Sequence, residues 1–182
     1  PAARAAPLLQ WAALIEQPAR EISALIAQPV KDVEPQALAD GWSRYARADA
    51  EAAAAAFPAL AQSRGLDRRA AGPYALSVAL PLSWSRHPRA LEFFRLAHAD
   101  DFDERAHEWH ARAALWAGDW REVAAATAAM PGDMRDQPRW RYWSARASEK
   151  LGDIAQAREL YAAVIPTDNW YAAHAAARLD RK

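Results

Sequence analysis

The densest group of carboxylates in this sequence lies between Asp100 and Glu104, where the order is DDFDE. Neighbouring carboxylates can act as general acid and base or can bind a divalent cation. Acidic side chains also stabilise the first turn of a helix, where the helix dipole is positive. Because a helical pattern begins at Glu104, we predict that this cluster is a helix N-terminus and not a catalytic site.

A second candidate for chemistry is a run with the residue types of a zinc site, formed by Glu104, His107, Glu108 and His110. The histidines are three positions apart, whereas the zinc-protease string HExxH places them four apart. A solvated helix explains the pattern with fewer assumptions. The sequence also has no cysteine, which excludes disulfides and cysteine-ligated zinc. We therefore predict no metal and no cofactor.

Aromatic residues form a third group, Trp140, Tyr142 and Trp143. Flat aromatic faces could stack on the pyranose rings of a glycan. The spacing of three between Trp140 and Trp143 instead places both on one helix face, together with Ala147 and Leu151, as expected for a packed core. We favour the core for the tryptophans and leave glycan stacking open.

Arginines near these aromatic residues suggest a surface for an anionic polymer. We predict binding positions at Arg139, Arg141, Tyr142 and Arg146, with no catalytic residue among them. The alternative is a scatter of ordinary salt bridges. The balance of 23 basic and 23 acidic residues favours that alternative unless the charges are segregated by face.

Composition excludes several classes of function. The chain has 182 residues with zero formal net charge, and so lacks the basic footprint of a nucleic-acid-binding protein. No apolar run approaches the roughly 18 residues of a transmembrane helix, so we predict no membrane span. Alanine supplies most of the 52% hydrophobic content, and nine tryptophans is a high number for this length, a combination suited to closely packed helices.

Hydrophobic spacing, caps and breakers predict an all-α fold, and no segment alternates with the period of a strand. The clearest predicted helices cover residues 104–117, 120–129, 139–151, 154–164 and 170–179. Pro73 and Pro81 predict an irregular segment between residues 70 and 80. We expect an N-terminal helical segment and connector at 1–34 and a helical superhelix at 35–182.

An internal repeat supports paired helices. Two Gly-Asp turns begin at Gly118 and Gly152, and 152 − 118 gives a period of 34 residues. Sliding the chain by this period aligns Trp109 with Trp143. Helix pairs with this period are typical of tetratricopeptide repeats, which stack into a superhelix. We therefore predict a right-handed α-superhelix of antiparallel helix pairs, tetratricopeptide-like in the C-terminal half.

Several strings in the C-terminal half resemble a known family. They are RAAL at 112–115, Gly118-Asp119-Trp120, WRYWSARA at 140–147 and WYAAHAAARL at 170–179. This pattern is similar to the superhelical region of the soluble lytic murein transglycosylases, and the string GWSRYAR at 41–47 is similar to its upstream helices. The family pattern implies structural roles for the following aromatic residues: Trp109, Trp120, Trp140, Trp143 and Tyr171. Ala172 and Asp180 stand where the family usually has glycine.

The resemblance implies a function for a larger parent protein. Family members cleave the β-1,4 bond between muramic acid and glucosamine, using one glutamate of a lysozyme-like domain that follows the helices. Its motifs, Glu-Ser and Gly-Leu-Met-Gln, do not occur here. We therefore expect that the catalytic domain is absent and that this chain alone is not catalytic, although its status as an enzyme stays open.

The expected partners follow from the same resemblance. They are a peptidoglycan glycan strand, bound through the parent enzyme, and the parent's own C-terminal catalytic domain. The expected location is the periplasm, with association with the outer membrane left open. The alternative is a stand-alone tetratricopeptide-like scaffold that binds a protein or peptide. The sequence downstream of Lys182 in the intact gene product would discriminate between the two.

Overall fold

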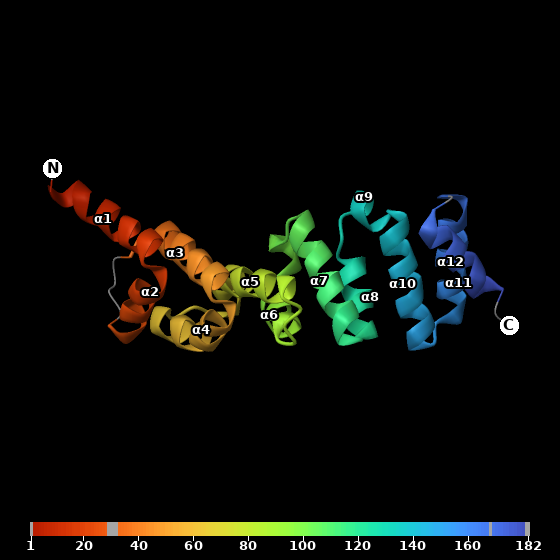
Figure 1. Cartoon of the computed structure of the whole chain (residues 1–182), viewed down its shortest axis with the longest axis horizontal. Helices are drawn as coiled ribbons and strands as arrows, with labels where there is room; N and C mark the ends of the chain where they lie inside the picture. The colour runs from red at the N-terminus through yellow and green to blue at the C-terminus, as the bar shows by residue number, and fades with distance from the viewer. Residues whose placement is uncertain (1, 29–32, 168, 181–182) are drawn as a thin grey trace. The chain divides into compact units, whose positions relative to one another are not determined.

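The computed structural model describes residues 2–28, 33–167 and 169–180, and their regular structure is entirely helical (Figure 1). The predicted all-α fold class is therefore confirmed. The α-helices are α1 (Ala2–Glu16), α2 (Pro18–Ala27), α3 (Pro35–Ala48), α4 (Ala50–Arg64), α5 (Arg68–Trp84), α6 (Ala90–Leu96), α7 (Glu104–Ala117), α8 (Trp120–Ala128), α9 (Gly132–Arg135), α10 (Pro138–Leu151), α11 (Ile154–Val164) and α12 (Trp170–Leu179). Short 3-10 helices cover Ala99–Asp101 and Ile165–Thr167. None of the described helices is long and apolar enough to cross a membrane.

The chain divides into two compact units, Pro1–Asp101 and Phe102–Lys182. The boundary predicted after residue 34 stays a prediction, and positions 29–32 of its connector lie outside the described residues.

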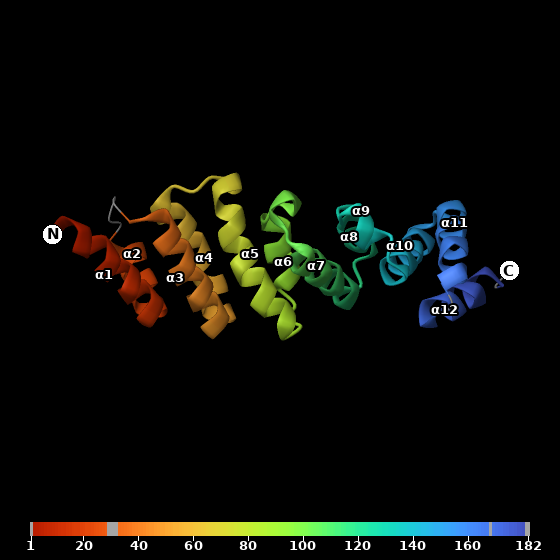
Figure 2. The same cartoon turned by 90° about the horizontal axis from the view of Figure 1, so that it is seen from above.

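In the first unit, α3, α4 and α5 lie beside one another (Figure 2). Trp42 is fully buried, and its indole N–H donates a hydrogen bond of 2.9 Å to the backbone oxygen of Tyr74. Its ring packs against Phe57, with ring centroids 6.4 Å apart. The hydrogen bond satisfies the one polar group of the largest buried side chain, so Trp42 can anchor α3 to α5.

Helix α3 also approaches α1 closely. A Cβ atom built on Gly41 would lie 2.9 Å from Cδ2 and 3.3 Å from the backbone oxygen of Leu14. Only a residue without a side chain fits this contact, which explains a glycine within an otherwise helical pattern.

The structure corrects one expectation in this unit. The segment with Pro73 and Pro81 is not irregular but lies within the continuous helix α5. Each proline removes one backbone hydrogen bond. The helix nevertheless buries Val78 and Leu82 almost completely, and we infer that this packing compensates for the lost bonds.

The second unit contains two helix pairs, α7–α8 and α10–α11, and the same turn joins the members of each. Gly118 and Gly152 end the first helices with positive φ angles of 67° and 90°. The next residue, Asp119 or Asp153, accepts a 3.1 Å hydrogen bond from the backbone N–H three positions later and so caps the second helix. The backbone N–H of each aspartate also bonds back into the preceding helix, at 3.1 and 2.9 Å, which completes a Schellman turn.

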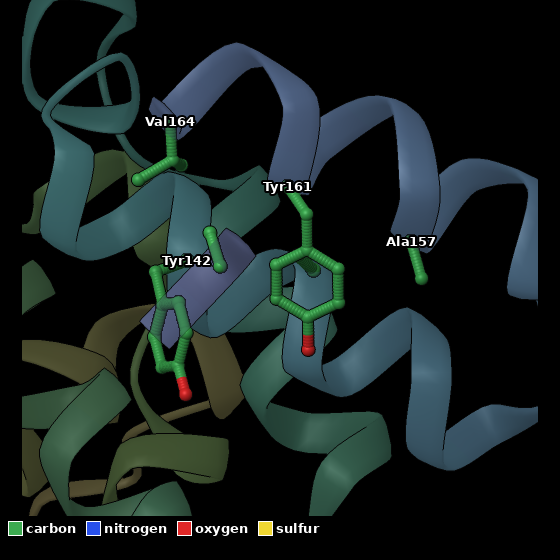
Figure 3. Packing of buried hydrophobic residues seen from close by; sticks show 6 residues of the cluster. Tyr142, Ala157, Tyr161 and Val164 are labelled. Atoms are coloured by element: carbon green, nitrogen blue, oxygen red, sulfur yellow. The ribbon is translucent and has the colours of Figure 1, made fainter. Parts of the chain in front are cut away.

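The core of the second unit is rich in aromatic residues. Tyr142 of α10 lies beside Tyr161 of α11, with ring centroids 5.8 Å apart, and Ala157 and Val164 pack close by from α11 (Figure 3). Trp143 packs against this cluster and also against a second one around Trp140. Tryptophan and tyrosine therefore fill the space that the alanines of these helices leave open.

One carboxylate joins the last three helices. Glu149 of α10 accepts a 2.7 Å bond from Arg146 and a 2.5 Å bond from the hydroxyl of Tyr161 in α11. Its other oxygen accepts a 3.2 Å bond from Arg178 in α12. Partial burial alone would raise the pKa of Glu149, but the bonds from Tyr161 and Arg146 outweigh it and lower that pKa. Burial, followed by the bond to Glu149, raises the pKa of Tyr161.

Glu149→Gln should lower the free energy of unfolding at neutral pH by about 1–2 kcal/mol, because hydrogen bonds to a charged group are lost. The pKa of Glu149 is lowered in the fold, so its contribution is present above the ordinary value of 4.5 and is lost as the pH falls through the lowered folded value. Urea denaturation between pH 3 and 7 should show the two proteins converging in stability at acid pH. The matched control is Glu159→Gln on the exposed surface of α11. Equal losses for the two variants would contradict the assigned role.

Gly118→Ala and Gly152→Ala should each destabilise the chain by about 1 kcal/mol, since residues with a side chain are strained at positive φ. No atom lies within 4 Å of a Cβ at either position, so the backbone conformation alone causes the loss. Thermal or urea denaturation measures it. Gly132→Ala is the control. The φ angle of Gly132 is not positive, so this variant should lose no stability. A loss at Gly132 as large as at Gly118 would contradict the explanation.

Candidate functional site

An open groove of about 580 Å³ lies between the first turns of α7 and the start of α10. Asp103 fixes one side, because its carboxylate accepts a 2.7 Å bond from the backbone N–H of Ala106 and caps α7. The helix N-terminus predicted for the acidic cluster is thereby confirmed. On the other side, Pro138 occupies the first position of α10 and places Arg139 in its first turn. The groove is lined by Asp103, Glu104, Arg105, Glu108, Met134, Gln137 and Arg139.

Arg139 is held in place by neighbours from both sides of the groove. Its Nη1 donates a 3.1 Å bond to Oε1 of Glu108, and its Nε donates a 3.1 Å bond to the side chain of Gln137. Oε1 of Glu108 also accepts a bond from Arg112. The guanidinium carbon of Arg139 lies 4.9 Å from the centre of the Trp140 ring, a cation–π distance. Arg139 therefore presents an oriented, partly exposed cation to the groove.

The other two predicted arginines lie in different surroundings. Arg141 forms an ion pair of 3.1 Å with Asp136, and about a third of its side chain is exposed. Arg146 is 11% exposed, donates to Glu149 and lies 5.7 Å from the ring centre of Trp120. Burial would lower the pKa of Arg146, but its bonds to Glu149 and Tyr161 raise it. Arg146 is thus part of the packing between helices, and the structure brings Arg139, Arg141 and Arg146 to no common pocket among the described residues.

Tyr142 belongs to the core and is only 5% exposed. Besides Tyr161, its ring contacts Trp143, Trp170 and Tyr171 at centroid distances of 5.3 to 6.2 Å. A glycan cannot reach its face without displacing these neighbours. The binding roles predicted for Arg139, Arg141, Tyr142 and Arg146 all stay predictions. Arg139 and Arg141 are the accessible members of this set, with about a third of each side chain exposed.

The residues of the family pattern differ in burial. Trp140 is 2% exposed, whereas Trp109, Trp120, Trp143 and Tyr171 are partly buried. Trp109 packs against Trp116 at 6.0 Å, and its ring also faces Arg112 at 5.0 Å. Trp120 lies beneath both Arg146 and Lys150. These positions pack helices together or lie beneath arginines, and their structural roles in the family pattern stay predictions.

The histidines of α7 differ from the sequence prediction. His107 and His110 are 4% and 8% exposed, so a solvated helix is wrong for these two positions. Phe102 packs against both rings, at 5.3 and 5.7 Å, and Nε2 of His110 lies 2.8 Å from a carboxylate oxygen of Glu122. Burial, with the nearby His110 as second cause, lowers the pKa of His107. Within the described residues, no group of histidines and carboxylates is placed to hold a metal ion.

Sequence reasoning missed most of the groove. Glu108, Met134 and Gln137 carry no motif, and they meet Arg139 only because α9 brings the chain back toward the start of α7. It also missed Glu149. The sequence signal for this residue is its position three residues after Arg146 in a helix, a spacing that allows an ion pair.

Comparison with protein families finds no match for this sequence, and no curated protein matches it. Solved structures do match. The 70-kDa soluble lytic transglycosylase from Escherichia coli is similar with a TM-score of 0.61 and 24% identity, over 88% of this chain and 26% of that one. A complex of the 70-kDa soluble lytic transglycosylase with bulgecin A is similar with a TM-score of 0.63 and 25% identity, over 92% and 27% of the respective chains.

These neighbours confirm the likeness expected from the sequence strings. The chain spans about a quarter of the length of the solved transglycosylases that it matches. Its fold is that of a helical region of a soluble lytic transglycosylase.

Proposed function

We propose that this chain is the non-catalytic helical region of a peptidoglycan-cleaving lytic transglycosylase, and that it positions murein for the catalytic domain of its parent. The observation that carries the proposal is the fold match over 88–92% of the chain. The strings WRYWSARA and WYAAHAAARL support it, because generic helical repeats share the helix spacing but not these paired aromatic residues.

The proposed role is geometric. We take the helix pairs α7–α8 and α10–α11 to be tetratricopeptide-like units, since identical turns 34 residues apart join their members. Stacked units of this kind offer a long surface suited to a polymer. The accessible cations Arg139 and Arg141 and the groove beside α7 are the parts of this surface that would contact murein. The proposed location of the parent is the periplasm, where its substrate lies.

The first test is retention on murein. The purified chain should sediment with insoluble peptidoglycan sacculi at about 0.15 M salt, where long-range attraction between exposed charges is screened. A helical protein of similar size and zero net charge is the control. Sedimentation no greater than that of the control would contradict the proposal and would favour the alternative of a stand-alone scaffold for a protein or peptide.

The second test concerns chemistry. Incubation of the chain with sacculi should release no soluble muropeptides above buffer, because the glutamate motif of the family's catalytic domain is not in the sequence. Chromatography of the supernatant measures the release, with a lysozyme digest as the positive control. Release by the wild-type chain that persists through repurification would overturn the assignment as a non-catalytic region.

A further inference from the structure

We propose that the groove between α7 and α10 binds a short peptide that carries both amino and carboxylate groups. The inference rests on the proposed function, in which the peptide stems of murein are ligands of this chemistry. It differs from the expected contact with the glycan, because it assigns recognition to the peptide and to a defined site.

The charges of the groove have both signs. Asp103, Glu104 and Glu108 supply carboxylates from α7 and its cap, while Arg105 and Arg139 supply guanidinium groups. A surface built for a polyanion would carry cations alone. A surface built for sugar rings would present aromatic faces, yet no aromatic side chain is among the lining residues. The lining therefore favours a zwitterionic peptide over a glycan.

The cationic side is already oriented. Bonds from Nε and Nη1 of Arg139 to Gln137 and Glu108 fix the plane of its guanidinium group. About a third of the side chain is exposed, and Nη2 is engaged in neither bond. A ligand carboxylate can accept from Nη2 without disturbing the fold, and the prior fixation reduces the entropy that binding would cost.

The anionic side is accessible. Glu104 is exposed in the first turn of α7 and forms no ion pair with the described residues. Glu108 uses Oε1 for both arginines, and its Oε2 enters neither bond. A ligand ammonium can therefore donate to the exposed carboxylate of Glu104. The groove is open to solvent and has a volume of about 580 Å³.

The experiment is calorimetric titration of the full chain with the free murein tetrapeptide, alanyl-γ-glutamyl-diaminopimelyl-alanine. Arg139→Gln and Glu104→Gln should each raise the Kd about tenfold, the effect of losing one charge-assisted bond. Arg121→Gln, on the exposed surface of α8, is the matched control and should leave the Kd unchanged. Arg139 also bonds to Glu108, and Glu104 lies in the first turn of α7, so both variants should first show a circular dichroism spectrum and a urea midpoint close to those of the wild type. A tetramer of N-acetylglucosamine should bind at least tenfold more weakly than the peptide.

The outcomes separate this inference from the proposed function. If the chain sediments with sacculi but does not bind the tetrapeptide, the inference is wrong and the proposed function stands. If the peptide binds but neither groove variant changes its Kd, the site is wrong. Equal binding of the sugar tetramer would also overturn the inference, and failure to bind both sacculi and peptide would overturn the inference and the function together.

Discussion

The carboxylate of Glu149 links the last three helices, α10, α11 and α12, to one another. It accepts bonds from Arg146 on its own helix, from Tyr161 on α11 and from Arg178 on α12. Alanine-rich helices bury little area per residue, so apolar contact alone orients them weakly. A charged acceptor with donors from separate helices supplies direction as well as energy. It also keeps the hydroxyl of Tyr161 satisfied inside the aromatic cluster of Figure 3.

The groove also depends on helix α10, at the end of the helix that lies opposite Glu149. Trp140 is buried beneath Arg139, so the packing that holds the ring also sets the height of the guanidinium above it. Glu108 then joins this guanidinium to α7. The side chains that we propose to bind murein therefore lie on helices fixed by buried aromatic residues, which is the arrangement that a pre-organised site requires.

Much of the fold could be predicted because its signals are local. The Gly-Asp turns at Gly118 and Gly152 specify both the end of one helix and the cap of the next within two residues. The helices 104–117, 154–164 and 170–179 accordingly have the bounds expected from the sequence. The acidic residues before α7 were predictable for the same reason, since a cap acts on the adjacent backbone.

The site was less predictable because tertiary contacts decide which helix face is covered. Tyr142 and Arg146 lie four apart on one face of α10, and nothing in that spacing reveals that α11 and α12 cover it. His107 and His110 looked like polar residues of a solvated helix, yet Phe102 and the neighbouring helix bury them. The partners of Arg139 come from separate elements, so no single segment carries the pattern of the groove.

We propose that this helical chain holds murein through the groove beside Arg139. Its nine tryptophans provide indole N–H signals that nuclear magnetic resonance can follow individually. Addition of soluble murein fragments should shift the signal of Trp140, which lies beneath Arg139, and leave that of the buried Trp42 unchanged. An unshifted Trp140 signal under conditions in which the fragments bind would contradict the claim.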